Sequence, residues 1–401
     1  MASGERRESE PGSSPAGESR KGDARPLSDV WLARVFDDPE SSQLGSGWLS
    51  GTMSVFLGAL GLLAVGVLWF PEWLSTARFR ALYPLPLVRA LIQAVIATGF
   101  AAGCLSMLLR RRKVLGLVGA LLSLAAALLG GGGVALPDAV EARPTLGLDW
   151  FVLNLFLLAL LFVPLERLFP RRPGQSTFRL GWTTDTLHFL ASHLLVQVLS
   201  FLILLPAVTV SRFLDPRGIA AAVRALPLVV QFLGAVLVAD LAQYAVHRAF
   251  HQLPLLWRFH AVHHSSRDMD WLAGSRLHVV DAVATRGLVL VPLQLLGFAE
   301  PALYAYLVFV SFHAVFIHAN VRFGFGWLER LVVTPRFHHW HHAAAEEARD
   351  RNFAVHLPWI DGLFGTAHLP EGAWPARYGI AGDPVPEGYL DQLAWPFRRR
   401  L

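Results

Sequence analysis

The chain has 401 residues, of which 54% are hydrophobic and only 16% are charged, against roughly 25% charged residues in an average soluble domain. Its formal net charge is +5 and its pI is about 9.8, but no basic stretch with interleaved aromatic residues indicates a nucleic-acid site, and we expect the excess of Arg to face lipid headgroups. The single cysteine, Cys104, excludes an intrachain disulfide and any site built from several Cys ligands.

Residues 1–45 are rich in Ser, Gly, Pro, Glu and Arg, and we expect a disordered tail because they offer little apolar surface to bury. Apolar segments follow, most of them near the roughly 20 residues that cross a bilayer. The six predicted spans are Met53–Phe70, Ala90–Leu109, Val114–Leu136, Trp150–Leu165, Leu187–Val210 and Ala225–Val246. A further pair, Ala282–Ala299 and Ala302–His318, predicts a spanning or re-entrant hairpin.

Basic residues are placed unevenly between these segments. They concentrate in the tail, at Arg110–Lys113 between the second and third spans, and at 167–179 between the fourth and fifth. Because basic loops stay in the cytoplasm, this pattern predicts a cytoplasmic N-terminus and a cytoplasmic location for the segments after residues 246 and 318. The Arg-rich, Lys-poor composition favours a bacterial plasma membrane.

Twelve of the sixteen histidines lie between His247 and His342. Most of them form three blocks, which read HRAFH, HAVHH and HHWHH. Offsets of three and four residues place side chains on one face of a helix. Neutral imidazoles that converge from such faces are typical of a metal site.

A lone interfacial histidine is more often a structural hydrogen-bonding group, and we apply that interpretation to His188, His193, His356 and His368. The blocks differ because they offer many ligands together. They supply His247, His251, His260, His263, His264, His338, His341 and His342, to which His278 and His318 add two more. Imidazole suits Zn, Fe, Cu and Ni. Eight to ten ligands suit two metals better than one, and two irons that reduce O2 and attack a C–H bond are the natural use.

The ordered blocks HRAFH, HAVHHSS and PRFHHWHH, followed by RDRNFAVHLPWIDGLFGT, resemble the fatty acid hydroxylase/sterol desaturase family of integral membrane di-iron enzymes. The resemblance covers roughly residues 180–370. It implies that the block histidines, together with His278 and His318, bind two irons. Two departures, Phe353-Ala354 after Asn352 and Gly362 after Asp361, touch no expected ligand.

Other residues are expected to support the ligands from behind, since a ligating imidazole usually donates its second N–H to a carboxylate or carbonyl. Asp240 lies seven residues before His247, and Asp281 lies three residues after His278. His339, which falls outside the family pattern, and Asn352 complete this expected group. No catalytic residue is predicted beyond the metal ligands.

The predicted function is an oxygen-dependent oxidation of a membrane lipid, by hydroxylation or desaturation. The sequence contains no Gly-rich dinucleotide motif or haem-attachment motif, so a separate ferredoxin, cytochrome or reductase must supply electrons. The alternatives are a membrane zinc hydrolase, for which no HExxH motif is present, and a non-catalytic metal-binding membrane protein. A transporter would place its polar groups at the middle of the spans.

The expected fold is all-α: a polytopic membrane helical bundle with a cytoplasmic, histidine-rich, di-metal helical cap. We expect four parts, namely the tail at 1–45, additional transmembrane helices at 46–145, the catalytic domain at 146–375 and a C-terminal tail at 376–401.

Overall fold

The computed structural model describes residues 45–74, 84–135, 148–198, 200–214, 217–382 and 385–398. Within these ranges the chain forms helices and no strand, with isolated bridges at Pro170–Val321 and Ala343–Tyr378. Five described segments are long and apolar enough to cross a membrane: Trp48–Trp69, Leu85–Leu109, Val114–Gly133, Leu228–Gln252 and Val279–Leu296. The predicted all-α, polytopic membrane bundle is therefore confirmed. Residues 1–44 of the predicted tail lie outside the described residues.

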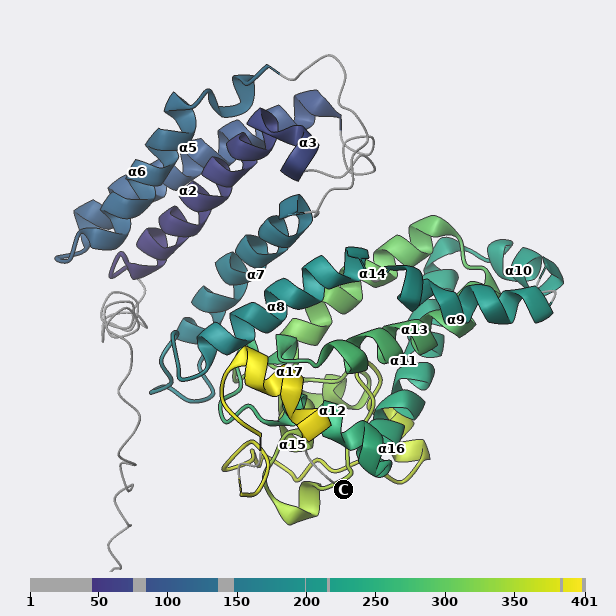
Figure 1. Ribbon diagram of the computed structural model, residues 1–401. Helices are drawn as coiled ribbons and strands as arrows, with labels where there is room; N and C mark the ends of the chain where they lie inside the picture. Colours follow the sequence, from purple (N-terminus) through teal and green to yellow (C-terminus); the bar gives the residue numbers. More distant parts are fainter. Residues whose placement is uncertain are drawn as a thin grey trace, which may run out of the picture.

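The first three long helices form a bundle of their own beside the rest of the chain (Figure 1). They are α2 (Trp48–Trp69), α5 (Leu85–Leu109) and α6 (Val114–Leu128), and a short helix, α3 (Pro71–Leu74), follows α2. Small residues let the helices approach closely, and Ser54 Oγ donates a hydrogen bond to Gly99 O at 2.7 Å. Such packing is typical of helices in lipid, where apolar burial gives little driving force for association.

The remaining long helices lead the chain repeatedly to one end of the molecule (Figure 1). They are α7 (Leu148–Leu168), α8 (Trp182–Val198), α9 (Ser200–Phe213), α11 (Leu228–Gln252), α13 (Val279–Leu296) and α14 (Glu300–Phe316). The end of α11, the start of α13 and the end of α14 meet there. At the opposite end lies α10 (Arg217–Arg224), where Gln231 Oε1 accepts a hydrogen bond from the Ala299 N–H at 2.8 Å. The tight pair at 282–318 therefore forms a hairpin.

Short helices and loops build a cap on the first of these ends. The cap contains α12 (Pro254–His264), η3 (Ala273–Ser275), η4 (Gly326–Arg330), α15 (Pro335–His341), η5 (Glu346–Ala348), α16 (Trp359–Leu363) and α17 (Tyr389–Arg398). The last helix is not detached from it: Gln392 is buried, and its Oε1 lies 2.8 Å from His188 Nε2. The expected boundary at 375 thus separates α17 from side chains that it contacts.

One predicted span differs from its helix, and another is divided by a residue that is not described. Over the span expected at Leu187–Val210 the described residues are helical, as the end of α8 to Val198 and the start of α9 from Ser200, and residue 199 lies outside the described residues. Much of α8 is a cap-facing helix, with Asp185 and His188 buried in polar contacts, which an apolar count does not detect. The span expected over Val114–Leu136 is helical only to Leu128, with a single 3-10 turn (η2) at Gly131–Gly133, since the Gly130–Gly133 run disfavours an α-helix.

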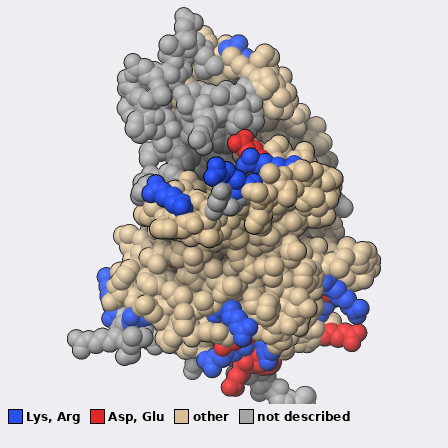
Figure 2. All heavy atoms as spheres, turned by 90° about the vertical axis from the view of Figure 1, so that its right-hand side faces the viewer, with Lys and Arg blue, Asp and Glu red and all other residues tan. Residues whose placement is uncertain are grey.

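One face of the molecule carries a band without charged side chains. On the face shown in Figure 2, this band separates a group of Lys, Arg, Asp and Glu side chains near mid-height from another group at the lower end. Many large apolar side chains on the helices are exposed, among them Leu108, Leu128 and Val229. An exposed apolar belt between charged ends is the expected surface of a protein that spans a bilayer.

We predict that Gly119→Ala destabilises the N-terminal bundle. A Cβ at Gly119 would lie 2.1 Å from Ser54 Oγ and 2.5 Å from the Ser54 carbonyl carbon on the facing helix. Overpacking of this kind costs about 1–3 kcal/mol, so thermal unfolding in detergent should begin at a lower temperature. The matched control is Gly66→Ala in α2, whose Cβ meets nothing within 4 Å. Equal melting temperatures for the two variants would contradict this packing.

Candidate metal centre

Three helix ends deliver the three histidine blocks to one buried place. The last turns of α11 carry His247 and His251, and the end of α12 carries His260, His263 and His264. The third block lies on α15, which begins with Pro335 at its first position, after Thr334, whose hydroxyl accepts a hydrogen bond from the Phe337 N–H. Proline and threonine are favoured at these positions, so the local sequence itself starts this helix.

Nine histidines form two groups in the structure. In each group, every ring contributes one nitrogen, and these nitrogens all lie within 4.8 Å of one another. Both groups draw on several elements, so neither is formed by one helix alone. The five-histidine group is His247, His251, His260, His264 and His341. The four-histidine group is His263, His318, His338 and His342.

Most rings in the two groups are held from outside through Nδ1, which donates to a backbone carbonyl or faces a carboxylate. The pairs are His247 with Phe353 O at 2.8 Å, His260 with Asp281 Oδ2 at 2.7 Å, His263 with Arg276 O at 3.0 Å, His318 with Ala314 O at 2.7 Å, and His341 with Arg351 O at 2.8 Å. His251 Nδ1 lies 3.5 Å from Asp350 Oδ1. A neutral ring that donates through Nδ1 keeps an unprotonated lone pair on Nε2.

The Nε2 atoms point inward and toward one another. Those of His247 and His260 are 3.0 Å apart, and those of His263 and His318 are 3.4 Å apart. Neither partner in these pairs has a proton to share, because both donate through Nδ1. Within the described part of the chain, the Nε2 atoms of His251, His264 and His341 and the Nδ1 atoms of His338 and His342 are also buried without a hydrogen-bond partner. Converging lone pairs without protons fit metal cations between them.

The electrostatics of the cap favour the same protonation state. Burial lowers the pKa of the histidines of both groups that lie outside the membrane helices, and the charge of neighbouring imidazoles adds to the effect. The pKa of His263 and that of His318 fall to about 3. At neutral pH these rings are therefore uncharged, as metal ligands must be.

One expected ligand is not brought to either group. His278 is the N-cap of α13: its Nδ1 accepts a hydrogen bond from the Val280 N–H at 3.1 Å, and its Nε2 donates to Leu393 O at 3.1 Å. Both ring nitrogens are thus engaged in local structure. The family resemblance does not reveal this, because sequence spacing alone cannot give the direction of the ring.

The expected supporting residues have different positions. Asp281 faces His260 and not the nearby His278. His339 lies outside both groups, with Nε2 3.2 Å from His318 O and Nδ1 2.8 Å from Tyr378 Oη.

Asp240 and Asn352 contact no ring of either group. The Asp240 carboxylate accepts hydrogen bonds from the backbone N–H groups of Val355, His356 and Leu357. The Asn352 side chain donates to Phe337 O and His368 O and accepts from the His368 N–H. Both residues shape the 352–368 loop, which supplies the Phe353 carbonyl behind His247.

Sequence reasoning missed several functional partners. The carbonyls of Arg276, Ala314, Arg351 and Phe353 carry no signal in the side-chain sequence, so only the fold reveals them. Asp350, which the sequence analysis does not single out, faces His251 at 3.5 Å and has a left-handed backbone, φ 56°.

Comparisons with known proteins agree with this arrangement. Residues 232–366 match the family model described as fatty acid hydroxylase, and this range contains all nine clustered histidines. The chain is 34% identical to an ornithine lipid hydroxylase of Rhizobium tropici over 43% of this chain and 52% of that protein.

Alkylglycerol monooxygenases are also similar. The Homo sapiens and Danio rerio proteins are 34% and 32% identical over 32% of this chain, which covers 28% of each relative. The chain therefore spans about half the length of the Rhizobium tropici relative and under a third of the others. No solved structure matches the chain.

We predict that the metal-free protein loses stability as the pH falls from about 7 toward 5. A histidine with a folded pKa of about 3 and an unfolded pKa of about 6.5 takes up a proton mainly when the protein unfolds. The stabilisation is therefore fully present above pH 6.5 and is lost below it, by on the order of 2 kcal/mol per histidine at pH 5. The test is to compare the melting temperatures at pH 7.5 and pH 5. The difference between them should be smaller in His263→Gln, which lacks one of these histidines. A pH-independent melting temperature would refute it.

Proposed function

We propose that this chain, whose residues 232–366 match the fatty acid hydroxylase family model, is a membrane-bound, oxygen-dependent lipid hydroxylase with two iron ions. The observation that carries the proposal is the pairing of inward Nε2 atoms that have no proton between them, as in His247 and His260. With the proton of each ring on Nδ1, a cation between the two Nε2 lone pairs makes such an approach favourable in a buried place. The family match and the two kinds of similar lipid oxygenase support iron as that cation.

Nine imidazoles in groups of five and four suit two metals of flexible coordination number. A structural or catalytic zinc takes three or four protein ligands in a tetrahedral arrangement, so a five-histidine group exceeds its needs. The five-histidine group would hold one iron and the four-histidine group the other. When bound, the iron pair would supply the redox chemistry that activates O2 for C–H cleavage, with the electrons delivered to it by a separate donor.

The residues of the chain itself hold and shield this chemistry. Outer hydrogen bonds keep the proton of rings such as His247 and His341 on Nδ1, so that Nε2 remains available. Burial of both groups excludes bulk water, which would otherwise quench a strong oxidant.

We propose a membrane lipid as the substrate, on the analogy of the ornithine lipid hydroxylase and the alkylglycerol monooxygenases. In the overall reaction a C–H bond and O2, with two electrons and two protons, give C–OH and water. The two electrons come from a separate donor such as a ferredoxin, a cytochrome or a reductase. Hydroxylation is preferred to desaturation because both relatives are named for inserting oxygen.

We also propose that the site faces the cytoplasm, in a bacterial plasma membrane. The basic stretch Arg110–Lys113 lies at the cap end of the molecule, since the adjacent Leu115 packs in one cluster with Trp271 and Val321 of the cap. The basic loop at 167–179 is joined to the same region, where the Arg171 N–H donates to Asn320 O at 3.1 Å. Basic loops are retained in the cytoplasm.

The parts of the chain then divide as follows. Residues 46–145 form additional membrane helices, and the catalytic unit begins near 146. We extend this unit beyond 375 to include α17, because Gln392 contacts His188 and Leu393 O accepts from His278.

The assignment predicts a distinct metal content for three variants. Wild-type protein in detergent should contain about two irons per chain. His341→Ala should empty the five-histidine group, and His338→Ala the four-histidine group, so each should retain about one. His278→Ala is the matched control and should keep both, since both ring nitrogens serve local hydrogen bonds. Elemental analysis after iron-supplemented expression gives the result.

Other results would point elsewhere. A single zinc in the wild type would favour the hydrolase, and a full metal complement without O2 consumption would favour a non-catalytic metal-binding protein. Loss of iron from His278→Ala equal to that from His341→Ala would make His278 a metal ligand and contradict its purely local role.

Lipid oxidation itself can be measured by mass spectrometry of the cellular lipids. Cells that express the wild type under ¹⁸O2 should contain a lipid that carries one added ¹⁸O atom. Cells that express His341→Ala should lack it, and His278→Ala should retain most of it. A lipid that instead loses two hydrogens without gaining oxygen would show desaturation. Unchanged lipids in all three strains would contradict an oxygenase acting on the lipids of that cell.

A further inference from the structure

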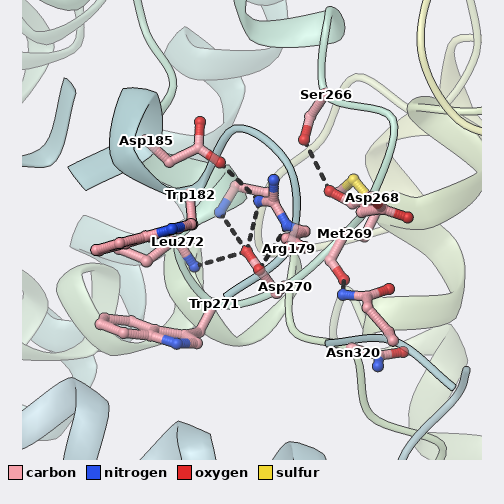
Figure 3. A network of polar contacts seen from close by, with 12 residues as sticks. Arg179, Trp182, Asp185, Ser266, Asp268, Met269, Asp270, Trp271, Leu272 and Asn320 are labelled. Atoms are coloured by element: carbon pink, nitrogen blue, oxygen red, sulfur yellow. Dashed lines mark hydrogen bonds and ion pairs between the residues drawn. The ribbon is translucent and has the colours of Figure 1, made fainter. Parts of the chain in front are cut away.

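The segment 265–278, which joins α12 to α13, is held by a buried ionic network (Figure 3). Arg179 lies at its centre. Its Nε donates to Asp270 Oδ2 at 2.6 Å and its Nη2 donates to Asp185 Oδ2 at 2.6 Å. Asp270 Oδ1 in turn accepts from the Leu272 and Ala273 N–H groups, at 3.1 and 2.9 Å, and so caps η3.

Asp185, on α8, connects two arginines that would otherwise not be linked. One of its oxygens accepts from Arg179 and the other accepts from Arg276 Nε. The Asp185 side chain is fully buried, and those of Arg179 and Arg276 are 3% and 8% exposed. When two buried guanidinium groups share one carboxylate, few other side-chain positions would keep all three charges paired. The contact between Asp185 and Arg276 therefore restricts the position of the Arg276 backbone.

The segment held in this way supports the four-histidine group. Its Arg276 carbonyl accepts the Nδ1 proton of His263 at 3.0 Å. A Cβ at Gly274 would lie 2.8 Å from His318 Nδ1, so this part of the segment packs directly on a second ring. On α7, Glu166 Oε1 joins the two sides, because it accepts from the Trp271 N–H at 2.7 Å and from the Asn320 N–H at 2.9 Å.

The five-histidine group takes its outer contacts elsewhere. His260 is held by Asp281 on α13, and His247 and His341 are held by carbonyls of the 351–353 loop. None of these contacts passes through the 265–278 segment. The two groups thus have separate supports, although their rings adjoin.

We propose that Asp185 is a positioning residue for the four-histidine group: through Arg276 it holds the His263 imidazole in place for one of the two metals. The inference rests on the proposed two-metal function and deepens it, since it makes the two metal sites separable. Asp185 and Arg179 both lie before residue 232, outside the range matched by the family model.

The test is metal binding by Asp185→Asn. Metal-free protein in detergent is dialysed against increasing Co²⁺, and the bound ions per chain are counted. An amide in place of the carboxylate leaves Arg276 without its buried anion, so the outer support of His263 shifts. The concentration that half-fills the second site should rise roughly ten- to one-hundredfold, as for other outer-support changes, while filling of the first site stays as in the wild type.

Two further comparisons identify which site is lost. At a Co²⁺ concentration that fills only the first site, adding His341→Ala to Asp185→Asn should remove the remaining ion, whereas adding His338→Ala should not. The matched control is Asp268→Asn, which removes the same charge from a residue within the 265–278 segment itself. Asp268 is one-third exposed and pairs with Arg172 at 3.5 Å, so this variant should bind as the wild type does.

The outcomes separate this proposal from the function itself. Wild-type protein that fails to bind two ions would count against the two-metal function. Wild-type protein that binds two, with Asp185→Asn filling both sites normally or weakening both equally, would overturn the positioning role. If Asp185→Asn is not recovered as folded protein, Arg276→Gln decides, because it removes the guanidinium that binds Asp185 and keeps the carbonyl that accepts from His263: selective loss of the second ion supports the proposal, and normal filling overturns it.

Discussion

The structure depends on where each buried imidazole keeps its proton. Outer acceptors hold that proton on Nδ1 in His247, His260, His263, His318 and His341, so the inner nitrogens of these rings are bare. In pairs of these rings, such as His247 and His260 with Nε2 atoms 3.0 Å apart, lone pair faces lone pair. The arrangement fits cations between the rings, and on the proposed function we expect folding of the cap and metal binding to be coupled.

The membrane helices make this arrangement possible by their direction. The chain reaches the cap at the end of α11, leaves it at the start of α13, and returns at the end of α14. The hairpin of α13 and α14 thus places His318 beside a block that lies 55 residues earlier in the sequence. Backbone groups in lipid must be satisfied internally, so long helices carry the chain across and the irregular segments gather in the cap.

Parts of the chain outside the matched range contribute to the same centre. Glu166, Arg179 and Asp185 come from α7, the loop after it and α8, and they hold the segment that carries Arg276 and Gly274. The C-terminal helix α17 contacts His188 and His278 through Gln392 and Leu393. The small-residue bundle of α2, α5 and α6 packs against α7 and stands apart from the histidines.

The sequence by itself determined the helical membrane fold and the identity of the clustered histidines. The length of an apolar segment indicates whether it can cross a bilayer, and spacings of three and four residues indicate that side chains share a helix face. Both are local properties of the sequence. It did not determine the local role of His278 or the choice of His260 as the partner of Asp281. Only the tertiary structure decided how the nine histidines divide into groups of five and four, and which backbone carbonyls accept their Nδ1 protons. These depend on how separate helix ends meet, and a backbone oxygen has no identity in the sequence.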